Sequence, residues 1–228
     1  MWDNAGPADH GQHRNPGMTA RLVRIGVIAI VAFALGLFLA RAVLPRVSQP
    51  PATELLTILP EPRILPPLTL VRHDGSTLDE RFFRGRWTFV FFGFTHCPDV
   101  CPTALSMLAR TRKALADLPA AVQPQVLFVS VDPARDDARQ LAAYVTFFDP
   151  SFVGATGSDA QVAAAAAAFS VPYAKVTTPD GGYTMDHGSG VFLVGPAGAL
   201  NALTSGASDP AALARDFRKV VDFVEQAR

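Results

Sequence analysis

Cysteine is scarce in this chain of 228 residues, and neither sign of charge is in excess. The two cysteines, Cys97 and Cys101, are too few and too close together to be the disulfide framework of a small secreted domain. Lys and Arg number 20 and Asp and Glu number 20, so the formal net charge is zero. Nucleic-acid binding needs a surplus of clustered positive charge. The composition therefore argues against a dedicated nucleic-acid-binding protein.

Long uncharged runs are also scarce, with one exception near the N-terminus. Residues 25–40 carry no charged side chain, and the longer segment 22–44 could span a hydrocarbon core of roughly 30 Å as a helix. This pattern predicts a cytoplasmic tail (residues 1–21) and a single transmembrane anchor (22–44) in the inner membrane, with the remainder of the chain on the outer side. The alternative is a secretory signal peptide, because Ala40-Arg41-Ala42 has the small-x-small form of a cleavage site.

The rest of the chain divides into a proline-rich segment and one domain. Residues 45–62 contain five prolines and predict an extended linker; its C-terminal end could instead lie on the domain. Residues 63–228 predict an α/β domain, a mixed sheet with helices on both faces. Strands are expected at 68–71, 76–78, 87–94, 125–131, 152–153, 171–176, 191–194 and 199–203, and helices at 104–118, 136–148, around 163–168 and at 209–227.

The cysteines follow a buried strand and precede a helix, within the stretch FGFTHCPDVCP at residues 92–102. Asp99 is the expected N-cap, and the helix N-terminus is expected to lower the pKa of Cys101. Side chains four positions apart share one helix face, so both sulfurs could bind one metal ion or form a disulfide. These states exclude each other, which predicts a redox-gated metal site. An inert disulfide that closes a short loop is the alternative.

Two thiolates need a further ligand, and two histidines near the motifs are candidates. His96 is next to Cys97, but neighbouring side chains should point apart. His187 lies just before the strand expected at 191–194, and Gly188 and Gly190 would let its loop approach another segment closely. The alternative for a single histidine in a loop is a solvated surface position.

Four segments together resemble the Sco/SenC family: FGFTHCPDVCP, SVDPARD at 130–136, YVTFFDPSFVGATG at 144–157 and MDHGSGVFLVGPAG at 185–198. The resemblance covers residues 63–228 and implies a thioredoxin-like fold, a membrane tether, copper binding and a role in the assembly of cytochrome c oxidase. It also implies that Cys97, Cys101 and His187 are the copper ligands. The family usually has Ser or Thr directly after this histidine. Gly188 stands there in this chain, which puts in doubt any hydroxyl that would orient the ring.

The predicted function is a copper chaperone that is not an enzyme in the turnover sense. It would receive Cu(I), with Cu(II) as a second state, from an upstream donor and deliver it to the copper-bearing subunit of the oxidase. Soft thiolates with one imidazole suit Cu(I), whereas zinc in an open site is the alternative. The alternative function is a thiol–disulfide oxidoreductase, with Cys97 and Cys101 as the redox-active pair. Three residues separate these cysteines, where thioredoxin-like enzymes have two.

Overall fold

The computed structural model describes residues 16–43, 49–206 and 209–226, and the chain divides into two units, residues 1–48 and 49–228. The first unit contains one helix, α1 (Pro16–Val43), so the helix predicted around 22–44 is found. Within the described residues, no helix is both long enough and apolar enough to cross a membrane. The first fifteen residues of the predicted cytoplasmic tail lie outside the described residues.

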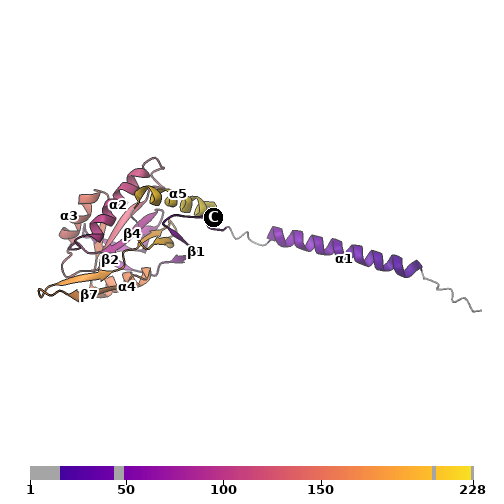
Figure 1. Cartoon of the computed structure of the whole chain (residues 1–228), viewed down its shortest axis with the longest axis horizontal. Coiled ribbons are helices and arrows are strands. Elements are labelled where there is room, and N and C mark those ends of the chain that lie inside the picture. The colour runs from indigo at the N-terminus through magenta and orange to yellow at the C-terminus, as the bar shows by residue number, and fades with distance from the viewer. Residues whose placement is uncertain (1–15, 44–48, 207–208, 227–228) are drawn as a thin grey trace, which may run out of the picture. The chain divides into compact units, whose positions relative to one another are not determined.

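The second unit is built on an eight-stranded mixed sheet in the order β1-β10-β9-β4-β5-β6-β2-β3 (Figure 1). Strands β4, β5 and β6 are parallel, and the other pairs are antiparallel. The strands are β1 (Thr57–Ile64), β2 (Thr69–Arg72), β3 (Thr77–Asp79), β4 (Thr88–Gly93), β5 (Gln125–Ser130), β6 (Val153–Thr156), β9 (Val191–Val194) and β10 (Ala199–Thr204). The helices are η1 (Glu80–Phe83), α2 (Val100–Ala114), α3 (Ala138–Phe148), α4 (Asp159–Phe169) and α5 (Pro210–Gln226).

Strand β4 forms the centre of the core, as its uninterrupted apolar sequence predicts. All six of its residues are buried. Because side chains alternate between the faces of a strand, Phe89 packs against Phe217 of α5 and Phe92 packs against Phe169 of α4. Figure 1 shows α2, α3 and α5 on one side of the sheet and α4 on the other. The predicted mixed sheet with helices on both faces is confirmed.

Strand β1 was not predicted, because its sequence contains Pro60 and Pro62. It pairs only with β10, at the edge of the sheet, where proline is tolerated because one side of the strand needs no hydrogen bonds. Its first residue, Thr57, lies within the segment predicted as a linker, residues 45–62. The sheet of the domain therefore begins before residue 63, and the C-terminal end of that segment lies on the domain.

A separate two-stranded sheet carries the predicted histidine. Strands β7 (Tyr173–Thr177) and β8 (Tyr183–His187) form an antiparallel hairpin outside the large sheet. Strand β7 was predicted, whereas β8 was expected to be a loop. Most residues of both strands are exposed or half-buried, so β8 has no apolar run that would indicate a strand. Its pairing fixes His187 at the end of a strand.

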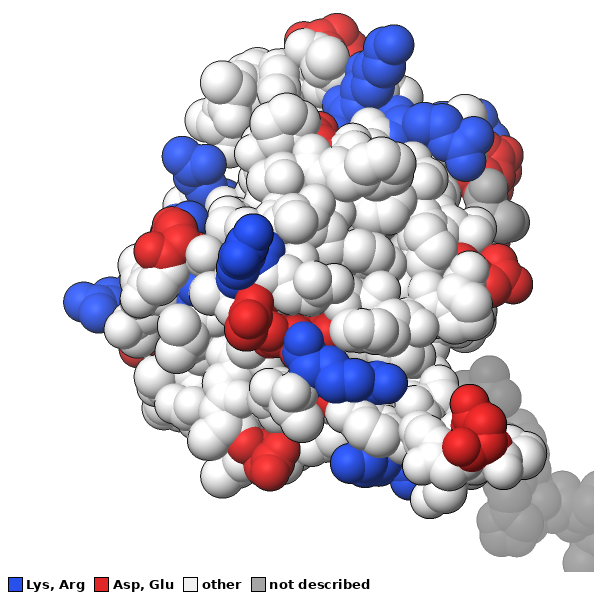
Figure 2. Space-filling model, turned by 90° about the vertical axis from the view of Figure 1, so that its left-hand side faces the viewer, with Lys and Arg blue, Asp and Glu red and all other residues white. Residues whose placement is uncertain are grey.

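The surface reflects the neutral composition of the chain. On the face in Figure 2, Lys and Arg side chains lie among Asp and Glu side chains, with uncharged surface between them. Neither sign of charge dominates this face. The mixed charges of this face therefore give no reason to expect long-range attraction of a polyanion to it.

Candidate metal centre

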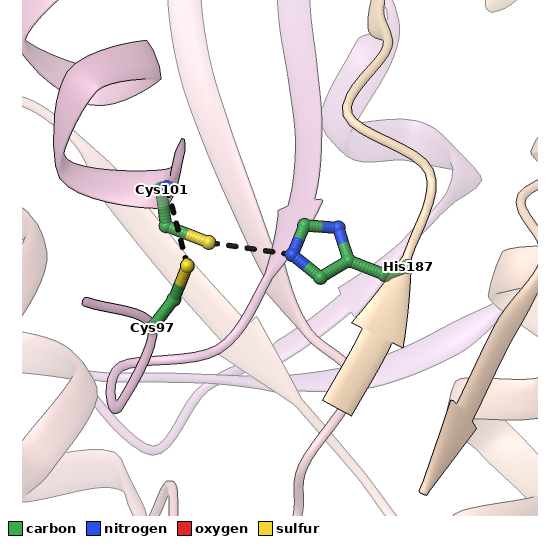
Figure 3. A group of neighbouring side chains, drawn as sticks. All are labelled: Cys97, Cys101 and His187. Carbon is green, nitrogen blue, oxygen red and sulfur yellow. Dashed lines mark hydrogen bonds between the residues drawn. The ribbon is translucent and has the colours of Figure 1, made fainter. Parts of the chain in front are cut away.

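Three side chains from separate segments converge at one end of β4. Cys97 follows that strand, Cys101 lies in the first turn of α2, and His187 is the last residue of β8. Their donor atoms, two Sγ atoms and a ring nitrogen, all lie within 4.8 Å of one another. In Figure 3 the two sulfurs and the imidazole edge face a common point. The three residues predicted to bind metal are therefore neighbours in space.

Cys97 takes part in the start of α2, where Asp99 was expected to cap the helix. Asp99 occupies the N-cap position, but its side chain makes no capping hydrogen bond. The backbone N–H of Cys101 instead points to the Cys97 sulfur at 3.5 Å. The predicted N-cap position of Asp99 is therefore confirmed, but its carboxylate does not cap the helix and the Cys97 sulfur lies at the helix end instead. The helix also begins at Val100, four residues before its predicted start.

Cys101 is fully buried, and its acidity differs from the expectation. Burial raises the pKa of its thiol far above the ordinary value, and the neighbouring Cys97 adds to this effect. The expectation of a lowered pKa from the helix N-terminus is therefore wrong, because desolvation of a thiolate outweighs the helix dipole. In the metal-free protein Cys101 is a protonated thiol, and a bound cation would have to displace that proton.

His187 presents one defined nitrogen to the sulfurs. Its Nδ1 lies 3.0 Å from the carbonyl oxygen of Gly188, and a carbonyl can only accept. Nδ1 therefore carries the proton, and the lone pair of Nε2 faces the Cys101 Sγ at 3.4 Å. The ring lies edge-on to Phe91 and Phe94, with centroids 6.1 and 5.8 Å away. A main-chain carbonyl thus orients the ring where Gly188 offers no hydroxyl.

The two flanking glycines were expected to allow a close approach of segments, and only one does so. A Cβ at Gly190 would lie 2.9 Å from the carbonyl oxygen of Thr204, a contact that real Cβ atoms do not make. A Cβ at Gly188 would meet nothing nearer than Pro172 at 3.5 Å, which is ordinary contact. The expectation is confirmed for Gly190 and is wrong for Gly188.

His96 lies outside this group. Its side chain is exposed, and its Nδ1 lies 3.1 Å from the Thr95 hydroxyl and 3.5 Å from the Asp136 carboxylate. Asp136 is fully buried and also accepts hydrogen bonds from the Thr95 backbone and from Ser130. These contacts fix the loop just before Cys97. The hydrogen bonds to Asp136 come from Thr95 and Ser130, and the exposed His96 ring lies outside the cluster of donors.

Gly93 is a site residue that sequence analysis missed. A Cβ at this position would lie 2.7 Å from the Cys101 sulfur and 2.9 Å from the Phe128 ring. Any larger residue would displace the thiol. The available signal was a glycine in an otherwise apolar buried strand, which often marks a close approach of another group.

A second missed feature connects the hairpin of His187 to the loop that follows β5. The Tyr183 hydroxyl donates to Asp132 at 3.0 Å, and Arg135 donates both to Asp132 and to the Tyr183 carbonyl. The Arg135 guanidinium lies 3.8 Å from the centre of the Tyr183 ring. We call these three residues the hairpin latch. It fixes β8 four positions before His187.

The family model described as SCO1/SenC matches residues 58–222 of the chain. The chain belongs to the SCO1/SenC family. The observed sheet with flanking helices is the Sco form of the thioredoxin fold, as the sequence predicts.

Relatives in this family differ in how much of the chain they match. The human protein named Protein SCO2 homolog, mitochondrial, is 37% identical over 198 residues, 85% of this chain and 73% of that protein. The crystal structure of Arabidopsis thaliana ScoI with copper bound is 32% identical, with a TM-score of 0.65 over 70% of this chain and 99% of that chain. BsSco, described as a member of the Sco family of cytochrome c oxidase assembly proteins, is 22% identical and shares the fold, with a TM-score of 0.55 over 70% of this chain and 94% of that chain.

The donor set in this SCO1/SenC chain fits a soft metal ion. The group contains two sulfurs and one imidazole nitrogen and includes no carboxylate. Thiolate and imidazole donors at low coordination number suit Cu(I), whereas structural zinc takes four protein ligands and hard cations take oxygen. The chemistry of the site therefore agrees with copper.

Proposed function

We propose that this chain is a copper chaperone that delivers copper to the copper-bearing subunit of cytochrome c oxidase during its assembly. Cys97, Cys101 and His187 hold the cargo ion. The observation that carries the proposal is the convergence of these three donors within 4.8 Å, with His187 86 positions from Cys101 in the chain. Membership of the SCO1/SenC family and the copper-bound Arabidopsis relative support it.

Loading with Cu(I) exchanges protons for metal and leaves the oxidation states unchanged. The buried thiol of Cys101 gives up its proton to solvent as its sulfur binds copper, and Cys97 does the same. The Nε2 of His187 needs no deprotonation, because Nδ1 carries the ring proton. The raised pKa of the Cys101 thiol makes loading weaker as the pH falls, since protons compete with copper for the sulfur.

Release proceeds by ligand exchange from the more accessible side of the site. Cys101 is fully buried, whereas Cys97 and His187 are half-buried. His187 also borders a hollow of about 280 Å³ beside Pro172 and Asp186. An incoming thiolate or imidazole of the partner can therefore replace Cys97 or His187 first, and Cys101 is the last ligand to leave.

The test is a competition titration of the full chain with Cu(I) against a chromophoric chelator. We expect Cys97→Ser and His187→Ala to lower the affinity by about tenfold or more, since each removes one of three ligands. His96→Ala is the matched control, because this histidine lies outside the cluster, and it should bind copper as the parent does. Unchanged affinity in both ligand variants would refute the assignment.

A second function has support from the same pair of sulfurs. Cys97 and Cys101 are both free thiols, one in the loop before α2 and the other in the first turn of that helix. In a thiol–disulfide exchange, the Cys97 thiolate would attack a partner disulfide, and Cys101 would then release the partner as a dithiol. Two electrons pass to the partner, and the chain is left with a Cys97–Cys101 disulfide that an upstream reductant must reduce.

One variant separates the two functions. His187→Ala removes a copper ligand and leaves both thiols in place. If thiol exchange is the main activity, the copper-free variant reduces an oxidised oxidase-subunit peptide at the rate of the parent. If copper delivery is the main activity, the loaded parent transfers copper to the reduced peptide and the variant does not. Mass spectrometry of the peptide reports both products.

We also propose that the domain works on the outer side of the inner membrane, with the N-terminal segment as its tether. The support is the uncharged run at residues 25–40. Protease treatment of intact spheroplasts should degrade the domain, whereas a cytoplasmic marker should survive. Protection of the domain would contradict this location.

A further inference from the structure

Five arginines gather around one hollow far from the metal centre. This hollow, which we call the arginine pocket, has a volume of about 640 Å³ and is lined by Arg72, Arg81, Arg84, Arg86 and Arg112. They come from the end of β2, from η1, from the loop before β4 and from the last turn of α2. Five of the chain's 20 Lys and Arg residues are thus brought to one place, and no Asp or Glu is among the described residues that line it.

Carboxylates outside the lining neutralise only some of these arginines. Arg72 pairs with Asp74 at 3.0 Å, and Arg112 pairs with Asp149 at 2.7 Å. Arg81 likewise pairs with Asp79. Arg84 and Arg86 are exposed, and neither has a carboxylate within 4.0 Å in the described part of the chain. The pocket therefore keeps an excess of positive charge.

Two of the guanidinium groups are held in place. Arg112 donates to the carbonyl oxygen of Pro124 at 2.8 Å and lies over the Phe152 ring, 6.0 Å from its centre. Arg72 lies over Phe82 at 5.9 Å, and its Nε atom is buried without a hydrogen-bond partner among the described residues. A buried donor without a partner is costly. Arg72 and Arg112 therefore keep their positive charges beside the pocket, where an anion can approach the group as a whole.

The pocket and the metal centre lie at opposite ends of the parallel strands. Arg84 and Arg86 precede β4, Pro124 precedes β5, and Val153 begins β6, so the pocket lies at their amino ends. Cys97 follows the carboxyl end of β4. Six residues of strand separate the two ends, about 20 Å at 3.3 Å per residue. A ligand in the arginine pocket would not touch the copper ligands.

We propose that the arginine pocket is a binding site for a small anion that carries a phosphate or diphosphate group with at least two negative charges. Guanidinium groups donate paired hydrogen bonds that match phosphate oxygens. Two arginines without carboxylate partners call for an anion with two charges rather than one. The volume lies within the range of roughly 300–1,000 Å³ of small-molecule sites. The anion offsets the positive charge of Arg84 and Arg86, which have no carboxylate partner in the described part of the chain.

The test is isothermal titration of the full chain with inorganic pyrophosphate at constant ionic strength. We expect binding at one site, weakened about tenfold or more in Arg84→Gln/Arg86→Gln, because both substitutions remove charge-assisted hydrogen bonds. Arg84→Lys/Arg86→Lys keeps the charge but loses the paired donors. Its affinity for pyrophosphate should therefore lie between that of the parent and that of Arg84→Gln/Arg86→Gln. Because Arg84 and Arg86 are exposed, neither pair of substitutions should disturb the fold. Circular dichroism of each variant checks this.

Two controls make the proposal falsifiable. Arg63→Gln/Arg139→Gln removes the same charge from exposed positions away from the pocket and should bind pyrophosphate as the parent does. Glycerophosphoglycerol, a lipid headgroup with one singly charged phosphate diester, should bind at least tenfold more weakly than pyrophosphate. The proposal is overturned if the parent does not bind pyrophosphate, or if both glutamine double variants lose the same amount of pyrophosphate affinity. It is also overturned if the headgroup binds more tightly than pyrophosphate. Copper affinity should be the same in all these variants.

Discussion

The two cysteines differ in environment, and this difference governs their chemistry. Cys101 is fully buried against Gly93, with its pKa raised by desolvation, whereas Cys97 is half-buried. Sequence spacing predicted that the two would share a face, and it could not reveal this asymmetry. Burial depends on residues such as Phe128 that lie elsewhere in the chain.

Alkylation of the metal-free protein should therefore be selective. Iodoacetamide at pH 8 should modify Cys97 about tenfold or more faster than Cys101, because each pKa unit above the ordinary value reduces the thiolate fraction about tenfold. Peptide mapping by mass spectrometry measures the two rates. In urea both thiols should react alike. Faster modification of Cys101 in the folded chain would contradict its burial.

Gly93 should tolerate no larger residue without a change at the metal centre. Gly93→Ala places a Cβ within 2.7 Å of the Cys101 sulfur, so the thiol must move. We expect Cu(I) affinity to fall about tenfold or more while secondary structure is kept. The control is Gly206→Ala, since a Cβ there meets nothing within 4 Å. Parent-like affinity in Gly93→Ala would show that the sulfur has room to adjust.

At the scale of elements, the strands that bury both faces were predictable, whereas two of the more exposed strands, β1 and β8, were not. Strands β4 and β5 stand out as continuous apolar runs, and the predicted bounds differ from the observed ones by one residue at each end or less. Strands β1 and β8 lack this signal, because edge pairing and hairpin pairing need few apolar side chains. The sequence therefore did not predict that His187 lies in a strand, although it did identify this histidine as a candidate ligand.

The hairpin latch should control how firmly His187 binds the cargo. Tyr183→Phe removes the hydroxyl that donates to Asp132, and Arg135→Ala removes the contacts with the Tyr183 carbonyl and ring. Both should weaken Cu(I) binding, Arg135→Ala the more, and neither should approach the loss in Cys97→Ser. Competition titration measures this. Tyr173→Phe, in the paired strand, is the control. If all three variants bind Cu(I) with the affinity of the parent, the hairpin latch has no influence on copper binding by His187.

At the scale of the whole molecule, α5 fastens the N-terminal end of the domain. Asp216 on this helix is fully buried and accepts hydrogen bonds from the backbone N–H groups of Glu54, Leu55 and Leu56 at 2.6–3.0 Å. Burial by itself raises the pKa of Asp216, but these three N–H groups outweigh it and lower the pKa below the ordinary value. More than 150 positions separate the partners, so no local pattern could have predicted this contact.

Asp216→Asn should lower the free energy of unfolding by about 2–3 kcal/mol near neutral pH, because hydrogen bonds to a charged acceptor are lost. Because the pKa of Asp216 is lower in the folded state than in the unfolded state, the ionised carboxylate stabilises the fold fully above the unfolded-state pKa near 3.9. This stabilisation is lost as the pH falls through the folded-state pKa. The difference between parent and variant should therefore shrink below about pH 4. Urea unfolding at several pH values measures it. Asp222→Asn, exposed on the same helix, should have little effect.

The proposed function depends on two sulfurs and one imidazole binding the same copper ion. X-ray absorption at the copper edge of the Cu(I)-loaded chain tests it most directly. We predict two sulfur neighbours and one nitrogen neighbour in the parent and in His96→Ala, and loss of the imidazole signal in His187→Ala. An imidazole signal that persists in His187→Ala, or a parent spectrum with no sulfur neighbours, would show that these three residues are not the copper ligands.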